Sequence, residues 1–198
     1  MNGILKLIAL ILAALAFFTP VLNCAGCSRD GTDGNVGSVV EKGNGGETVD
    51  LPAIINENSD LPVAYMSLSP DYGSEEMEAL TQTYEMIHNF MSNDYYGDDL
   101  AFFYYGYPND ESPYHLAKIV LYTERYHILG VTIGSDIRQA VETLRSYGFE
   151  GTSQFDEIFS YAELSCGDFT IEMTARDGYA VTGFELSAAS VYLGNRIY

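Results

Sequence analysis

Several residue types are scarce in this sequence of 198 residues, and the scarcity narrows the functions it can have. The chain has only 9 lysines and arginines but 28 aspartates and glutamates, which gives a net charge of −19. Proteins bind phosphate backbones and anionic lipid headgroups chiefly through Lys and Arg, so we expect neither nucleic acid nor an acidic lipid surface as a partner. We expect the acidity to keep a folded domain soluble, and a specific cationic partner is the alternative.

Cysteine is also scarce, because the chain has only Cys24, Cys27 and Cys166. Three thiolates are too few for a four-cysteine zinc site, and no histidine lies near the first two to complete one. The C-x-x-C spacing of Cys24 and Cys27 occurs elsewhere in redox pairs, but such a pair needs a folded helix start to lower the thiol pKa. We interpret Cys166 as a small buried residue beside a turn, and we expect no metal and no cofactor.

Long apolar runs are missing except near the N-terminus. Residues 7–18 form an unbroken apolar run after Lys6. A run of about 7 to 15 residues is typical of the central part of a signal peptide, whereas a membrane-spanning helix needs about 20. Pro20 interrupts the continuation. The sequence therefore predicts a removable signal peptide over residues 1–26.

The end of this segment carries small residues before a cysteine. Ala25 and Gly26 precede Cys27, while Cys24 follows the bulky Asn23. The pattern resembles a lipobox, in which the cysteine receives a lipid and becomes the new N-terminus, although Cys24 stands where leucine is usual. The resemblance implies lipidation at Cys27, with Cys24 as the alternative, and a chain that is lipid-anchored to a bacterial membrane on its extracytoplasmic side. Ordinary cleavage and an uncleaved anchor stay open.

The chain changes composition at about residue 50. Residues 27–50 are mostly Gly, Ser, Asp, Asn and Thr, which is typical of a flexible tether. Apolar residues return from position 51. We therefore expect residues 51–198 to form a single domain, since their number suits one core.

Two amphipathic helices are expected in this domain. The first begins at Ser74 and continues to about Met91, because apolar residues recur there at spacings of three and four. The second is capped by Ser135 and ends at Gly148, where glycine suits the left-handed conformation that closes a helix.

Strands are expected over residues 101–107, 117–126, 158–164 and 169–175. The last of them leads into a tight turn at Asp177 and Gly178, which would pair Ala175 with Ala180. Helices alternate with hairpins, so the predicted class is α+β, with an antiparallel sheet and two helices packed on one face. Both helices begin at Gly-Ser, an arrangement that a tandem helix-plus-strands duplication would produce.

No catalytic motif is evident, because the sequence has no nucleophile elbow, no H-E-x-x-H and no P-loop glycine pattern. His88, His115 and His127 lie on different predicted elements, and we interpret each as structural or surface. The enzyme alternative is an extracytoplasmic hydrolase in which an Asp or Glu lies beside His115 or His127 with a shifted pKa.

Aromatic residues are dense between positions 95 and 107, where seven of thirteen positions carry a ring. Alternate residues of a strand face opposite ways, so some of these rings must lie away from the core or beneath another element. Nearby acids offer the oxygen ligands that calcium uses but lack its loop spacing, so we interpret them as a solvated loop, with a calcium or glycan binder as the alternative. The acids are Asp94, Asp98, Asp99, Asp110 and Glu111, and the amide of Asn93 lies beside them in the sequence. The candidate interaction patch consists of Tyr95, Tyr96, Tyr105, Tyr107, Asp98 and Asp99, and ordinary sheet packing is its alternative.

A further pattern covers residues 130–181. Its features are Gly130-Val-Thr, a helix with Val141 and Leu144, the closing Gly148, a strand with Phe159 and Tyr161, and the hairpin at Asp177 and Gly178. This stretch resembles the repeating unit of small exported bacterial lipoproteins, including the SmpA/OmlA type of outer-membrane assembly subunit. The proline that commonly follows the closing glycine is replaced by Phe149. The resemblance implies a non-catalytic adaptor, so the predicted function is a surface-tethered binding module for a protein or glycan of the cell envelope.

Overall fold

The computed structural model describes residues 39–40, 49–106, 114–176 and 178–189. The predicted signal peptide, both candidate lipidation cysteines and most of the tether lie outside these residues, as do Tyr107, Asp110 and Glu111. Predictions about them stay predictions. None of the helices in the described ranges is long and apolar enough to cross a membrane.

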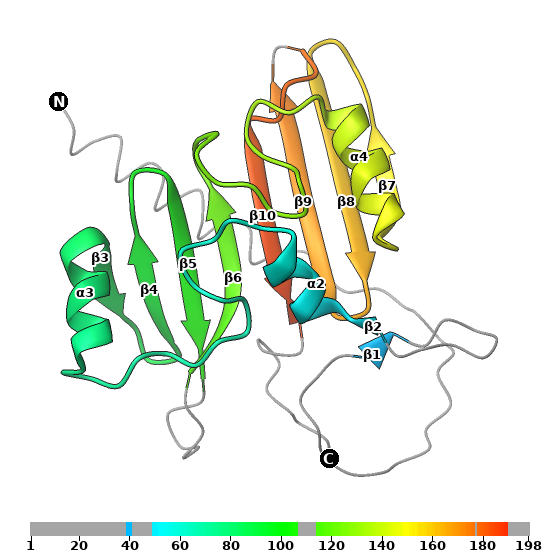
Figure 1. Ribbon diagram of the computed structural model, residues 1–198. Coiled ribbons are helices and arrows are strands. Elements are labelled where there is room, and N and C mark those ends of the chain that lie inside the picture. Colours follow the sequence, from blue (N-terminus) through cyan, green and yellow to red (C-terminus); the bar gives the residue numbers. More distant parts are fainter. Residues whose placement is uncertain (1–38, 41–48, 107–113, 177, 190–198) are drawn as a thin grey trace, which may run out of the picture. The chain divides into compact units, whose positions relative to one another are not determined.

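The described chain contains three helices and an eight-stranded antiparallel sheet, which confirms the α+β class (Figure 1). The helices are α2 (Leu51–Glu57), α3 (Glu75–Thr83) and α4 (Ile137–Ser146). The sheet is formed by β3 (Glu85–His88), β4 (Ser92–Tyr96), β5 (Leu100–Tyr105), β6 (His115–Leu121), β7 (Glu150–Gln154), β8 (Phe159–Cys166), β9 (Phe169–Arg176) and β10 (Gly183–Ala188). A separate small ladder pairs β1 (Val39–Val40) with β2 (Val49–Asp50).

The order of strands across the sheet is β3-β4-β5-β6-β10-β9-β8-β7. Each half is therefore a helix followed by a four-stranded meander, α3 with β3 to β6 and α4 with β7 to β10. The halves meet at their last strands, where β6 and β10 pair antiparallel with Ile119 opposite Leu186. This topology repeats the order of one helix followed by four strands, as the tandem arrangement predicts.

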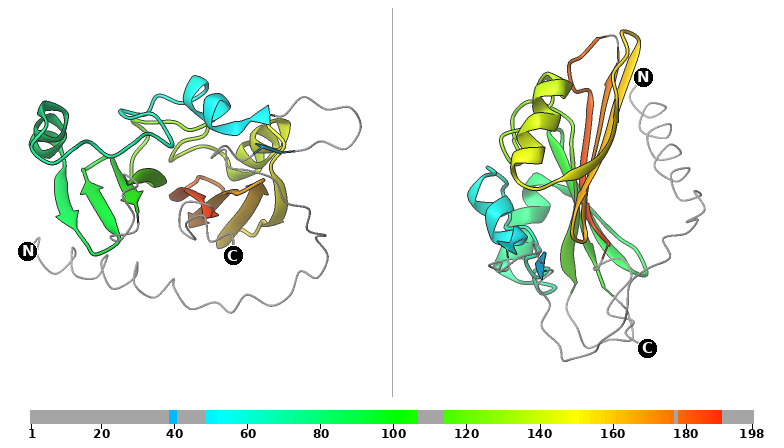
Figure 2. Two further views of the ribbon diagram at one scale, coloured as in Figure 1. Left: turned by 90° about the horizontal axis from the view of Figure 1, so that it is seen from below. Right: turned by 90° about the vertical axis from the view of Figure 1, so that its right-hand side faces the viewer.

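The described helices lie on one side of the sheet in Figure 2. Helix α4 packs on β8 and β9 and buries Ile137, Val141 and Leu144, which lie on one helical face as their spacing dictates. Helix α2 was not predicted, and it adds Leu51 and Ile55 to the same core. Helix α3, by contrast, buries no residue fully.

The predicted first helix was too long. It begins as expected, since the Ser74 hydroxyl accepts a hydrogen bond from the Met77 backbone N–H, but it ends at Thr83 and not near Met91. Tyr84 takes an extended backbone and packs its ring edge-on against Phe102, 4.9 Å between centroids. The chain then becomes β3, because its backbone groups pair with β4, and this pairing overrides the helical spacing of its apolar residues.

The start of the second helix and the last hairpin also differ from the prediction. The cap is Asp136 and not Ser135, since the Asp136 carboxylate accepts from two backbone N–H groups of the first turn. In the hairpin, Phe184 lies opposite Met173, a shift of two residues from the predicted pairing of Ala175 with Ala180. Ala180 instead forms a bridge with Asp136 at the start of α4, so it does not pair with Ala175. A shift of two keeps every side chain on its predicted face.

Candidate functional site

The sheet has a second face, opposite the described helices, which we call the open face. Alternation along the strands assigns side chains to it, because residues next to each core position must point the other way. The open face carries Asp94 and Tyr96 from β4, Phe103 and Tyr105 from β5, Lys118 and Val120 from β6, Glu185 from β10, Glu172 and Thr174 from β9, and Tyr161 and Glu163 from β8.

An aromatic cluster occupies the β4 to β6 part of this face and consists of Tyr96, Phe103, Tyr105 and Tyr122. The rings of Tyr96 and Phe103 meet edge to face at 5.6 Å. Burial, with help from the Asp94 carboxylate, raises the pKa of Tyr96 to about 12. Tyr122 follows β6 and is 46% exposed, and burial of its hydroxyl together with the charge of Glu185 raises its pKa. These tyrosines therefore stay neutral at physiological pH and present apolar rings with hydroxyl donors.

A row of three glutamates crosses the other half of the open face. Glu163 lies opposite Glu172 in the β8–β9 ladder, and Glu172 lies opposite Glu185 in the β9–β10 ladder. Directly opposite residues of antiparallel strands have Cβ atoms about 5 Å apart, so each neighbouring pair repels. Partial burial raises the pKa of Glu172, and the charges of Glu185 and Glu163 raise it further. We call these three residues the glutamate row.

Lys118 lies between the aromatic cluster and the glutamate row. Its ammonium is 2.6 Å from a carboxylate oxygen of Glu185 and 5.5 Å from the centre of the Phe103 ring. Its charge also lowers the pKa of Glu172 and of Asp94, although burial outweighs it in both cases. The Lys118 ammonium therefore interacts with three carboxylates, those of Glu185, Glu172 and Asp94.

Asp94 is the most buried carboxylate of the open face, with 7% of its surface exposed. Its Oδ2 accepts a 2.7 Å hydrogen bond from the Asn89 side-chain amide. Its Oδ1 is fully buried and has no hydrogen-bond partner among the described residues. Burial raises the pKa of Asp94, while the bonds from Ser92 and Asn89 lower it.

The structure does not place the residues of the predicted interaction patch on one surface. Tyr95 is buried at 1% exposure and stacks on Phe102 at 4.9 Å, so the expectation that it stays accessible is wrong. Tyr96 and Tyr105 do lie on the open face and are partly exposed. Asp98 and Asp99 lie in the turn between β4 and β5, where Asp99 binds Arg125 at 2.7 Å and that bond lowers its pKa.

The acidic segment predicted as a solvated loop is instead partly a strand. Asn93 and Asp94 belong to β4 and are buried, because β3 and β5 pair with β4 on either side. No group of three or more His, Cys, Asp or Glu side chains within the described ranges lies close enough together to hold a metal ion.

The histidines lie apart, as the sequence suggested. His115 begins β6, and His88 ends β3 with its Nδ1 2.6 Å from the side-chain oxygen of Asn93. His127 does have a carboxylate beside it, with Nδ1 3.0 Å from Asp60, as the hydrolase alternative requires. Both side chains of that pair are nearly half exposed, which is the geometry of a surface ion pair.

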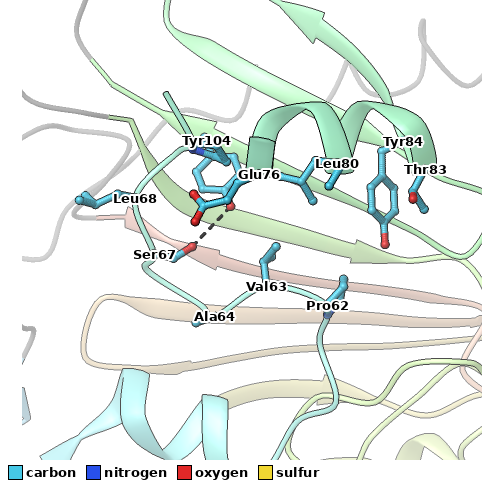
Figure 3. A pocket seen from close by; sticks show the side chains of 12 residues that line it. Pro62, Val63, Ala64, Ser67, Leu68, Glu76, Leu80, Thr83, Tyr84 and Tyr104 are labelled. Carbon is cyan, nitrogen blue, oxygen red and sulfur yellow. Dashed lines mark hydrogen bonds between the residues drawn. The ribbon is translucent and has the colours of Figure 1, made fainter. Parts of the chain in front are cut away.

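A groove of about 450 Å³ lies between α3 and residues 62–70 (Figure 3). Its walls are mainly apolar and include Leu68, Leu80 and Tyr84. At its floor the Tyr104 hydroxyl is 3.4 Å from that of Ser67, and burial raises the pKa of Tyr104. The groove explains why α3 buries no residue fully.

Sequence reasoning found two of the open-face residues and missed Phe103, Lys118 and the glutamate row as members of one surface. The usable signal was a glutamate at a polar position in each of three neighbouring strands, but only the correct register aligns them. Comparison of the chain with protein-family models, curated proteins and solved structures gives no match, so the function must be argued from these residues.

Proposed function

We propose that this chain is a non-catalytic adaptor that binds a protein partner through the open face. The observation that supports this is the aromatic cluster on a sheet face that no described helix covers. A face that met only solvent would be expected to alternate core residues with polar ones, whereas Phe103 and Tyr122 present rings there. Aromatic residues, tyrosine above all, are enriched in protein interfaces because they bury large area with few rotatable bonds.

The size of the face suits a protein partner. Eight strands spaced about 4.8 Å apart span about 34 Å, and strands of four to eight residues are about 14 to 27 Å long. A surface of these dimensions matches the roughly 800 Å² that one partner contributes to a standard interface.

The predicted cellular location of the chain fits the same role and is part of the proposal. A lipid on Cys27 and a tether over residues 27–50 would hold the domain near a bacterial membrane on the extracytoplasmic side. A tethered module gains effective concentration toward partners in or near that membrane.

Site-specific photo-crosslinking in the source cells tests the proposal. A photoreactive amino acid replaces Thr174 on the open-face side of β9, opposite Tyr161, and a matched variant carries it at Gln139 on the exposed side of α4. We expect a defined crosslinked protein from position 174 and not from position 139. That protein, once purified, should bind the chain in solution, and Phe103→Ser should weaken the binding at least tenfold.

Equal crosslinking from both positions, or none from position 174, would count against the proposal. A carbohydrate adduct at position 174 would indicate that the partner is a glycan and not a protein.

A further inference from the structure

We infer that the partner contributes an extended cationic segment, with Arg or Lys at alternate positions, that lies across the glutamate row. This inference rests on the proposed function and adds the chemistry of the partner. It follows from charge complementarity and from the way Lys118 already binds on this face.

The charge on the open face is unbalanced. Glu163, Glu172 and Glu185 lie on three consecutive strands, directly opposite one another. Like charges in such pairs destabilise a sheet, so their alignment has a cost that folding alone does not repay. Of the basic residues in the described strands of this face, Lys118 contacts Glu185, and Arg176 lies at the far end of β9 beside Phe159. Neither Glu163 nor Glu172 forms an ion pair with a side chain of the described residues.

Lys118 shows how a cation sits on this surface. Its ammonium is bound by Glu185 at 2.6 Å and lies over the Phe103 ring at 5.5 Å. This combination of a carboxylate and an aromatic face is a favourable site for Lys or Arg. A similar combination occurs on β8, where the Tyr161 hydroxyl donates a 2.7 Å bond to Glu163. No side chain of the described residues supplies a cation at this second position.

Asp94 provides an independent sign that the face lacks positive charge. Its side chain points to the open face, and 7% of the surface of the residue is exposed. One of its carboxylate oxygens has no hydrogen-bond partner within the described part of the chain. A buried charge without a full set of partners is costly unless compensating charge is near. Lys118 lowers the pKa of Asp94 but is bonded to Glu185. Asp94 lies on β4, three strands away from Glu185 on β10, so it shows the shortage of cations on this face but is not part of the glutamate row.

The spacing of the row defines the shape of the ligand. Carboxylates on adjacent strands are about 5 Å apart, so the row spans about 10 Å. An extended chain crossing the strands places alternate side chains about 7 Å apart, so two or three cations at alternate positions cover the row. Tyr161 and Tyr122 flank its two ends, where they can stack on guanidinium groups.

Fluorescence anisotropy with a labelled peptide Ser-Arg-Ser-Arg-Ser-Arg-Ser tests the inference on the full chain, and the same peptide with Gln in place of Arg is the neutral control. One variant neutralises the row with Glu163→Gln, Glu172→Gln and Glu185→Gln. A matched variant neutralises Glu75, Glu76 and Glu78 on α3, so both variants change the net charge equally. Melting temperatures of both variants establish that they are folded.

We expect the arginine peptide to bind the wild type at physiological salt and the row variant about tenfold more weakly, as the loss of three partly exposed ion pairs implies. The α3 variant should stay within about twofold of the wild type. No binding to the wild type, or an equal loss in both variants, would overturn the inference and indicate only general attraction to an acidic protein. Crosslinking from position 174 is read separately, so the adaptor proposal can hold while the cationic ligand fails.

Discussion

Replacing Glu172 by glutamine should stabilise the domain at neutral pH. Glu172 lies opposite Glu163 on one side and Glu185 on the other, and each like-charge pair costs roughly 0.2 to 1 kcal/mol. Solvent screening and the lost attraction to Lys118 reduce the gain, so we expect about 0.5 to 1 kcal/mol. For a domain of this size that free energy corresponds to a rise in melting temperature of about 1 to 4 °C.

The effect should depend on pH in a defined direction. The pKa of Glu172 is raised in the folded protein, by burial first and then by Glu185 and Glu163. A carboxyl group whose pKa is raised by folding contributes its full stabilisation below its unfolded pKa, which is about 4.3 for glutamate. This stabilisation is lost as the pH rises through the pKa of the folded state. Thermal melts followed by circular dichroism should therefore show a difference between variant and wild type at pH 7.5 that disappears near pH 4. Glu157→Gln, in an exposed loop, is the control. A destabilised Glu172→Gln variant, or a gain that persists at pH 4, would show that the row does not repel as described.

Three further predictions concern other parts of the chain. Asp94→Asn should raise the urea midpoint at pH 7.5 and lose this advantage near pH 4, because burial raises the pKa of Asp94; an unchanged midpoint would mean that its charge is compensated. Tyr65→Phe should lower the free energy of unfolding by about 1 to 3 kcal/mol, since the Tyr65 hydroxyl donates a 2.6 Å bond to the buried Ala117 carbonyl, and peptide binding should not change. A fatty-acid analogue should label the wild type and not Cys27→Ala; unchanged labelling would transfer the prediction to Cys24, and labelling of neither would contradict lipidation.

Local signals allowed α4 and the class of the fold to be predicted. The apolar stripe of α4 and Gly148 after its end both act within a few residues, and Gly148 has the left-handed φ of 91° that closing a helix requires. The exact cap, Asp136 and not Ser135, was not predicted. The region after Thr83 was mispredicted because its helical spacing competes with pairing to β4. That partner strand contains Ser92, Asn93 and Asp94, which are typical of loops, so neither strand could be recognised alone.

The candidate site was harder to predict because it depends on register. The predicted hairpin would have placed Glu172 opposite Gly183, whereas the observed one places it opposite Glu185. Ala180 bridges Asp136, more than forty residues away, and no local pattern encodes that contact. Tyr96 and Tyr105 were found because aromatic density is a local property. Tyr95 was misassigned because the face of a strand residue follows only once the strand's neighbours are known.

The seam between β6 and β10 has a consequence for the order in which the chain folds. Within each half, neighbouring strands are close in sequence, so the two meanders can form through short loop closures. The seam instead joins residues more than sixty positions apart, and β10 is the last of these strands to leave the ribosome. Until β10 docks, the first half keeps the edge of β6 unpaired and open to other strands. A chain of this topology therefore passes through a half-assembled state in which a chaperone that covers β6 would prevent aggregation.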